Sequence, residues 1–268
     1  MNRRTFLSAG CSVTAGWAFS EERPQANSIG VGLKQEPLGF ALDQLEPHLD
    51  AENLRHHYEV IHTDYSIKLR STLRSVDLEV ANLSNLITCI KTIPMPANSR
   101  SILTFSRKTG PLPEEVQADI RHFGGGHQCH TVFWRFLAPP GTGPKGPEGR
   151  VAEAIQGTFG SIEDFKRAFT QAALSHVGDG WAWLVHRPDG KLVITTTSGN
   201  DYPRMKDFLP VEKVGRPLLC LDLWDHAYHP KYKGHRENYI AAWWNVVNWS
   251  FMSRAYAIVT SPLAMGSL

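Results

Sequence analysis

The sequence has few cysteines, almost no excess charge of either sign, and no long apolar run. Its 4 Cys include no Cys-x-x-Cys pair, which argues against a zinc ribbon and a thioredoxin-type redox site. The 28 Lys and Arg against 26 Asp and Glu leave a formal net charge of +2, so we expect neither nucleic acid nor an anionic membrane as a partner. Because a membrane helix needs about 20 apolar residues, we also expect no membrane span.

The residues that are present fit a globular protein. The chain has 268 residues, of which 42% are hydrophobic and 20% charged, and this composition predicts one large domain or two small ones. Histidine is abundant, with 12 copies. We interpret His48, His176, His186 and His235 as surface residues or as core residues with satisfied hydrogen bonds.

The first residues are typical of an export signal. Arg3-Arg4 is followed by an uncharged, small and apolar segment over Phe6–Phe19, and Ala18-Phe19-Ser20 suits a signal peptidase. We predict that residues 1–20 are a twin-arginine signal and that the mature protein is periplasmic or extracellular. A basic, unstructured N-terminus is the alternative. Twin-arginine export moves proteins that are already folded, which agrees with a metalloprotein.

Composition and periodicity divide the mature chain into two halves of different character, an α+β fold. We predict an extended segment over residues 21–41 and a helical hairpin domain over residues 42–139. A Pro- and Gly-rich linker over residues 140–150 follows. Residues 151–268 are predicted to form an α/β domain with a small three-stranded antiparallel sheet.

Helical spacing in the first half predicts three helices. They cover Ala51–Leu73 with Asp50 as N-cap, much of Leu78–Ile90, and Glu114–Ala138. The last contains Gly124-Gly125-Gly126, and each glycine inside a helix costs about 1 kcal/mol relative to alanine. Three in a row therefore suggest that another group approaches the helix very closely.

The second half mixes helices with β-rich runs. A Pro-Asp-Gly turn between two such runs predicts a hairpin. In chain order we predict a helix from the N-cap Ser161 to His176, strands over Trp181–Val185 and Leu192–Thr196, a third strand over Leu218–Leu223, and an aromatic-rich closing helix over Tyr239–Tyr256.

Three segments far apart in the sequence carry metal-binding side chains. They are His56-His57-Tyr58, Gly124 to His130, and Leu221 to His229. Together they suggest that three imidazoles and one carboxylate meet at one metal, and this ligand set suits a redox-capable first-row ion. The residues alone leave open whether His127 and His130 both bind or His130 binds alone.

These segments resemble the iron/manganese superoxide dismutase family over roughly Leu42 to Ala257. The resemblance implies superoxide as the substrate and a homodimer as the assembly. The matching motifs, in chain order, are His57-Tyr58 with Tyr65, Gly124-Gly125-Gly126-His127-Gln128-Cys129-His130-Thr131-Val132-Phe133-Trp134, Gly180-Trp181-Ala182-Trp183-Leu184, Asp222-x-Trp224-Asp225-His226-Ala227-Tyr228, and Arg236-x-x-Tyr239 with Trp244-Asn245-x-x-Asn248-Trp249.

The resemblance implies one Mn or Fe ion per subunit, which cycles between two valences as it oxidises one superoxide and reduces the next. It makes His56 and His127 neighbours of the site and Tyr65 the gate and hydrogen-bond partner of the metal-bound solvent. The implied metal ligands are His57, His130, Asp222 and His226. The implied apolar wall consists of Trp134, Trp181, Trp183 and Trp224.

Several positions depart from the family pattern. Gly126 stands where the iron branch has Gln, which favours manganese. The other location of that amide holds Asn200, which is one methylene shorter than Gln. Cys129 replaces an Asn beside a ligand.

Three further departures lie at the site entrance. Ile61 replaces a His and His229 replaces a Tyr, so the family's His–Tyr contact between subunits is either lost or rebuilt with His229 and Tyr65 as the new pair. Asp225 replaces a Glu that bonds a ligand across the dimer interface.

Two other functions remain as alternatives. The departures at Ile61, Asn200 and Asp225 would suit a non-catalytic metal-binding protein on the same scaffold. Zinc hydrolysis with His127, Cys129 and His130 is disfavoured, because no helix-borne Glu base accompanies them in a known zinc spacing.

Overall fold

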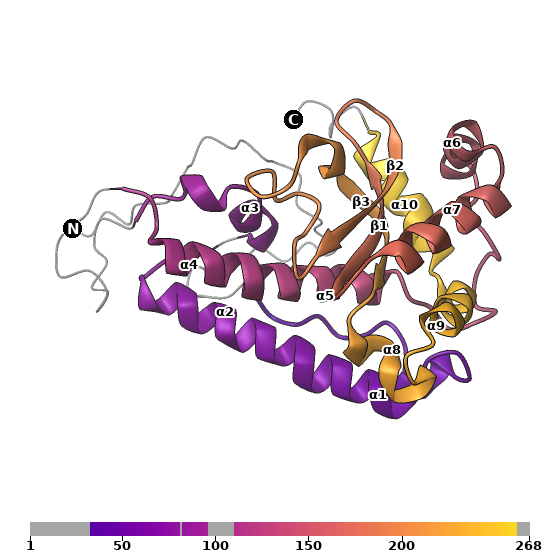
Figure 1. Ribbon diagram of the computed structural model, residues 1–268, viewed down its shortest axis with the longest axis horizontal. Coiled ribbons are helices and arrows are strands. Elements are labelled where there is room, and N and C mark those ends of the chain that lie inside the picture. The colour runs from indigo at the N-terminus through magenta and orange to yellow at the C-terminus, as the bar shows by residue number, and fades with distance from the viewer. Residues whose placement is uncertain (1–32, 81, 96–109, 262–268) are drawn as a thin grey trace.

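The structure is a computed structural model that describes residues 33–80, 82–95 and 110–261 (Figure 1). The predicted export signal over residues 1–20 and most of the predicted extended segment lie outside the described residues. Within the described ranges, none of the helices combines the length and apolar character needed to cross a membrane.

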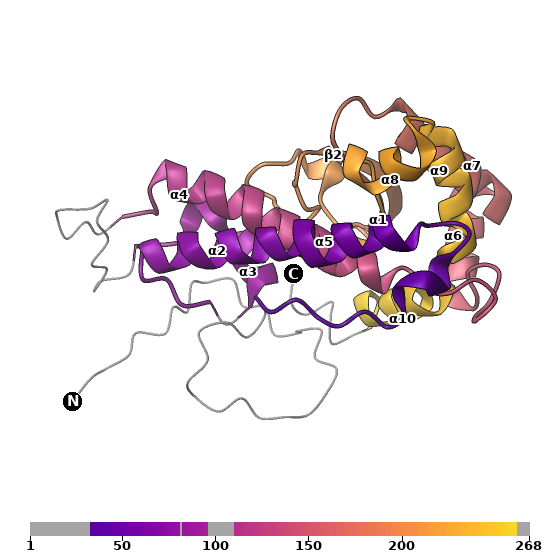
Figure 2. The ribbon, with the colours of Figure 1, turned by 90° about the horizontal axis from the view of Figure 1, so that it is seen from below.

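The first half is built on two long antiparallel helices (Figures 1 and 2). The first begins with α1 (Ala51–Arg55), continues through the π-helical η2 (His56–His62) and ends with α2 (Thr63–Ser75). The Asp50 carboxylate accepts a hydrogen bond of 2.8 Å from the Asn53 backbone N–H, so the predicted N-cap is confirmed. A short turn, η1 (Leu42–Leu45), precedes it.

The second long helix runs through α4 (Glu114–Asp119), η4 (Ile120–Gly124) and α5 (Gly125–Arg135). In chain order, α3 (Leu83–Thr88) and η3 (Ile90–Thr92) come between the two long helices. The helix predicted over Leu78–Ile90 is therefore shorter, because its N-cap is Asn82, whose side chain accepts from the Asn85 N–H at 3.2 Å.

The close approach expected at the three glycines is confirmed. A Cβ on Gly124 would lie 3.1 Å from Ile87 Cγ2, and one on Gly126 would lie 2.5 Å from Tyr65 Cδ1. A Cβ on Gly125 would lie 2.1 Å from the Asn200 carbonyl oxygen. The glycines therefore let the second long helix pack directly against both its partner helix and the C-terminal half.

The second half contains the predicted three-stranded antiparallel sheet, in the order β2-β1-β3. Its strands are β1 (Gly180–His186), β2 (Leu192–Ser198) and β3 (Arg216–Asp222). The turn between β1 and β2 uses Gly190 at φ 83°, a conformation that favours glycine. In the central strand, Trp181 pairs with Thr197 on one side and with Asp222 on the other.

Helices flank the sheet. The predicted helix from Ser161 is α7 (Ile162–Ser175), and the Ser161 side chain caps it by accepting from the Asp164 N–H at 3.0 Å. Another helix, α6 (Arg150–Phe159), lies where none was predicted. A short turn, η5 (Val211–Lys213), sits in the long connection between β2 and β3.

The closing segment corrects the single helix predicted over Tyr239–Tyr256. After α8 (Asp225–Tyr232) the chain forms α9 (Arg236–Trp243), η6 (Trp244–Val246) and α10 (Trp249–Val259). The break has a tertiary cause, because Val247 forms a β-bridge with Leu137 and the Asn248 N–H donates to the Phe136 carbonyl at 2.8 Å. The Asn248 side chain then caps α10 at the Phe251 N–H.

The two halves share one core. Helix α5 packs against β3, and α1 packs against α8, so the end of β3 lies beside the long helices (Figure 1). This junction contains the His-rich segments identified in the sequence.

Candidate metal centre

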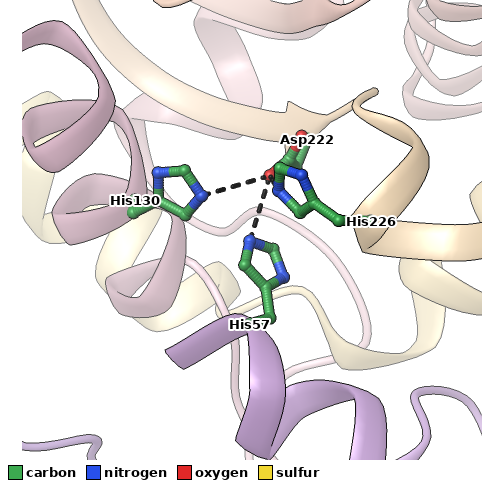
Figure 3. A group of neighbouring side chains, drawn as sticks. All are labelled: His57, His130, Asp222 and His226. Atoms are coloured by element: carbon green, nitrogen blue, oxygen red, sulfur yellow. Dashed lines mark ion pairs between the residues drawn. The ribbon is translucent and has the colours of Figure 1, made fainter. Parts of the chain in front are cut away.

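Four side chains from four elements meet at the junction of the two halves (Figure 3). Their potential ligand atoms all lie within 4.8 Å of one another. η2 supplies His57, α5 supplies His130, β3 ends at Asp222, and the first turn of α8 supplies His226. The four residues that the family resemblance singled out are therefore brought together.

The facing atoms of this cluster converge to ion-pair distances (Figure 3). Asp222 Oδ2 lies 3.2 Å from His57 Nε2, 3.3 Å from His226 Nε2 and 3.7 Å from His130 Nε2. All four atoms are buried, yet none has a hydrogen-bond partner within the described part of the chain. Buried polar atoms normally have partners. Four that lack them at one point, three nitrogens and one oxygen, fit a first-row metal ion.

Other atoms of the ligands are held in place by backbone groups. His130 Nδ1 donates to the Gly126 carbonyl at 2.7 Å, which leaves the lone pair of Nε2 free for a metal. Asp222 Oδ1 accepts from the Trp224 backbone N–H at 2.9 Å, so its Oδ2 faces the imidazoles. These bonds orient the ligands before any ion binds.

Burial sets the protonation states that a metal requires. Burial lowers the pKa of His57 from 6.5 to about 4, and it also lowers the pKa of His130 well below its ordinary value. For Asp222, burial raises the pKa, but the neighbouring His226 and His57 outweigh that effect and hold the pKa below its usual range. At neutral pH these two imidazoles are neutral and the carboxylate is ionised, as metal binding demands.

Indole rings wall the cluster. Trp134 stands edge-on to His57 at 4.8 Å between ring centroids, Trp181 stands edge-on to His130 at 5.1 Å, and the Trp224 ring lies 5.7 Å from that of His226. Trp181 is fully buried and Trp134 is 6% exposed. Trp183 lies one layer further back, where it contacts Trp181 and donates to Thr197 Oγ1 at 2.9 Å.

Tyr65 and Asn200 complete the polar lining. The Tyr65 ring lies 5.3 Å from the His130 ring, and burial raises the pKa of Tyr65 to about 12, with the Asn200 amide acting in the opposite direction. The phenol therefore keeps its proton at any physiological pH. Asn200 is 3% exposed, and its Oδ1 is a further buried atom without a partner among the described residues.

Asp225 and His229 lie outside the cluster. Both are exposed on α8. The Asp225 carboxylate accepts from Tyr228 Oη at 2.8 Å, and Arg236 Nη2 donates to the same hydroxyl at 3.2 Å. In the described part of the chain no hydrogen bond or ring contact joins His229 to Tyr65, so a pair between them would need a second copy of the chain.

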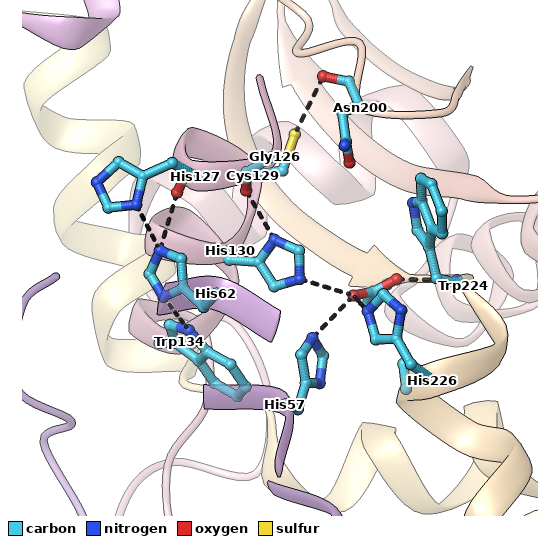
Figure 4. Close-up of polar contacts among 12 residues, drawn as sticks. His57, His62, Gly126, His127, Cys129, His130, Trp134, Asn200, Trp224 and His226 are labelled. Carbon is cyan, nitrogen blue, oxygen red and sulfur yellow. Dashed lines mark hydrogen bonds and ion pairs between the residues drawn. The ribbon is translucent and has the colours of Figure 1, made fainter. Parts of the chain in front are cut away.

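His62 is a buried neighbour of the site that the sequence reasoning did not single out (Figure 4). It is 1% exposed, its ring stacks on His130 at 5.4 Å, and its Nε2 lies 2.8 Å from His127 Nδ1. Trp134 Nε1 donates to His62 Nδ1 at 3.1 Å. His127 is therefore turned toward His62 and away from the cluster, and of the pair on α5 only His130 faces the converging atoms.

The three cysteines of the described residues, Cys89, Cys129 and Cys220, are all buried. No disulfide joins any two of them.

Known proteins resemble the chain along most of its length. Residues 34–138 match the alpha-hairpin domain of iron/manganese superoxide dismutases, and residues 147–255 match the C-terminal domain of the same family. A protein of Leptolyngbya boryana named superoxide dismutase [Mn] 1 is 37% identical over 225 residues, which are 84% of this chain and 80% of that protein.

Two further relatives have the same extent of similarity. The superoxide dismutase [Mn/Fe] of Methylomonas sp. (strain J) is 36% identical over 82% of this chain and 95% of its own length. The superoxide dismutase [Mn] of Thermus aquaticus is 36% identical over 84% of this chain and 97% of its own length.

Proposed function

This chain belongs to the iron/manganese superoxide dismutase family and is a superoxide dismutase, and we propose that it is exported, loaded with manganese and active as a homodimer. The observation that carries the activity is the convergence of four buried ligand atoms that have no hydrogen-bond partners among the residues the structure describes. When bound, a Mn or Fe ion supplies the one-electron chemistry by which two superoxide anions and two protons give dioxygen and hydrogen peroxide.

The residues of the chain would hold the ion and control what reaches it. His57, His130, His226 and Asp222 would bind it as three imidazoles and one carboxylate. The indoles of Trp134, Trp181 and Trp224 exclude bulk water from the ligands. The Tyr65 hydroxyl retains its proton at neutral pH and can donate it to a hydrogen bond at the edge of the site.

Two observations support manganese over iron. Gly126 cannot be replaced by a larger residue without moving Tyr65, because a Cβ there would lie 2.5 Å from Tyr65 Cδ1. Packing against Tyr65 therefore excludes from this helix position the amide that the iron branch carries there. Two of the three relatives described above carry manganese in their names and the third carries both metals.

Export is supported by Arg3-Arg4 and the apolar segment that follows. A homodimer is supported by the position of Asp225 and His229, which are exposed on α8 next to a ligand. The molecular mass of the native protein in solution tests the homodimer. Comparison of the compartment of the native protein with that of an Arg3→Lys, Arg4→Lys variant tests export. A monomer in solution, or equal export of the variant, contradicts the respective part of the proposal.

Metal analysis together with a superoxide-consumption assay tests the catalytic proposal on protein purified from its native source. We expect close to one manganese per chain and dismutation that is lost in His57→Ala. Stoichiometric metal with no dismutation above that of His57→Ala would instead support the non-catalytic alternative.

A further inference from the structure

Asn200 is buried in the connection after β2, and the contacts that hold it come from the second long helix. Its neighbour Asp201 is 8% exposed and forms a two-pronged ion pair with Arg121 of η4. Arg121 Nε lies 2.6 Å from Oδ1 and Nη2 lies 2.7 Å from Oδ2. A two-pronged guanidinium–carboxylate pair fixes orientation as well as distance.

The connection is also fastened further along. The Arg121 guanidinium carbon lies 4.4 Å from the centroid of the Phe208 ring, and the Lys91 ammonium lies 5.0 Å from the same centroid. The Asp207 carboxylate accepts from the Lys91 backbone N–H at 3.1 Å. These contacts tie residues 201–208 to the helical half.

Small side chains on α5 allow the Asn200 backbone to come close. The Asn200 carbonyl would lie 2.1 Å from a Cβ on Gly125, and Cys129 Sγ donates to it at 3.8 Å. Gly125 and Cys129 are four residues apart, so they share one face of the helix. The thiol of Cys129 is smaller than the Asn side chain expected there from the family pattern, which leaves room for the approaching backbone.

The Asn200 side chain is itself oriented. Its Nδ2 donates to the His122 carbonyl at 3.2 Å, and Figure 4 shows the side chain directed from the backbone toward the side on which Trp224 and the ligands lie. The amide nitrogen carries two hydrogens: the bond to His122 uses one, and the amide is also hydrogen-bonded with Tyr65, whose pKa it lowers against the effect of burial.

We propose that Arg121 and Asp201 are positioning residues that hold the short Asn200 amide at the metal site. The Asn200 backbone packs there against the small residues Gly125 and Cys129. The position of the amide in turn sets the midpoint potential of the bound metal. The close approach of the backbone makes up for the methylene that Asn lacks relative to Gln. The part that concerns the potential rests on the proposed function, whereas the seating of Asn200 does not.

The direction of the effect follows from hydrogen bonding. An amide N–H that would donate toward a group beside the bound ion favours the anionic form of that group. An anion in turn favours the higher metal charge. When the ion pair is lost and the amide withdraws, the midpoint potential should rise.

Asp201→Asn in the full chain tests the proposal, because it removes the charge at almost the same size. Seating is measured without metal, as the rate at which iodoacetamide alkylates Cys129, located by peptide mass spectrometry. We expect the rate to rise about tenfold, which corresponds to about 1.4 kcal/mol of easier opening. Arg121→Lys keeps the positive charge but loses the planar guanidinium that donates two parallel hydrogen bonds, so its Cys129 alkylation rate should be intermediate.

Glu36→Gln is the matched control. It removes another two-pronged ion pair made by the same long helix, in which Arg135 Nε donates to Glu36 Oε2 and Nη2 donates to Oε1. Redox titration of the manganese-loaded proteins should show a raised midpoint potential in Asp201→Asn and the wild-type potential in Glu36→Gln.

Two results overturn the proposal. The first is an unchanged Cys129 alkylation rate in a folded Asp201→Asn protein. The second is faster alkylation with an unchanged or lowered midpoint potential. Absence of dismutation in the wild-type protein would contradict the proposed function but leave the alkylation result valid, so the two failures are distinguishable.

Discussion

Two pairs of buried imidazoles lie side by side in this protein, one within the ligand cluster and one beside it. The ligand cluster takes His57 from η2 and His130 from α5, and the neighbouring pair takes His62 and His127 from the same two elements. All four side chains are at most 1% exposed. Burial, residue type and helix of origin are therefore alike in the two groups.

The difference lies in the hydrogen bonds. In the pair, Trp134 donates to His62 Nδ1, so His62 carries its proton on Nε2 and donates it to His127 Nδ1. In the cluster, the facing nitrogens and Asp222 Oδ2 have no partners among the described residues. A metal centre is thus marked by converging atoms that the protein leaves unsatisfied, and not by the number of buried histidines.

The largest expected effect separates the two groups directly. His57→Ala removes a ligand. Loss of a residue that only hydrogen-bonds a ligand lowers metal affinity or activity by about 10–100-fold, and we expect both to fall by more than this in His57→Ala. His62→Gln, which alters the hydrogen-bonded His62–His127 pair, should keep its metal. Elemental analysis and superoxide consumption measure both. Equal metal loss in the two variants would contradict the comparison.

Metal removal should destabilise only a protein with an intact cluster. Without an ion, Asp222 and its imidazoles keep their desolvation cost uncompensated. Metal at 100 times its dissociation constant should stabilise the fold by about 2.7 kcal/mol, which raises Tm by about 5 °C or more at this chain length. Calorimetry with and without a chelator checks this shift. A similar shift in His57→Ala would show that the ion binds elsewhere.

Acidification should destabilise the folded protein through His127, the partner of His62. Burial lowers the pKa of His127 from 6.5 to about 4, so between these values the unfolded chain binds more protons than the folded one. Stability must then fall as pH drops from 6.5 to 4, by up to about 3 kcal/mol for this residue. Denaturant unfolding of metal-free protein should show a flatter pH dependence in His127→Gln. Parallel curves would contradict the assignment.

The smallest expected effect concerns the donor that closes the pair. Trp134→Phe removes the N–H that bonds His62 Nδ1 at 3.1 Å, and an unsatisfied buried acceptor costs about 1–3 kcal/mol. Metal content should not change, because Trp134 supplies no ligand. Urea unfolding and elemental analysis measure the two quantities. A loss of bound metal in the folded Trp134→Phe protein would instead show that Trp134 supports the ligand cluster.

Much of the fold could be predicted from local sequence. The caps at Asp50 and Ser161 and the turn at Gly190 depend on nearby residues alone, and all three were found. The break at Val247 could not be predicted, because its cause is a bridge to Leu137, far away in the sequence. Local pattern there favoured a continuous helix, and tertiary hydrogen bonds overrode it.

The site divides in the same way. The spacing of Asp222 and His226 and the family resemblance pointed to the four ligands. The resemblance also placed Tyr58 and Tyr65 beside the site, yet nothing in the sequence showed that His62, which lies between them, bonds to His127. That contact joins two helices whose relative rotation depends on how closely Gly126 lets them pack.

By itself, the sequence determined which groups were available: three imidazoles and a carboxylate at fixed places on helices and at a strand end, together with the glycines that permit close packing. Only the tertiary structure decided which imidazoles face an ion and which face each other. The reason is physical, since a hydrogen-bond partner or its absence is a property of two segments brought together, and no single segment carries it.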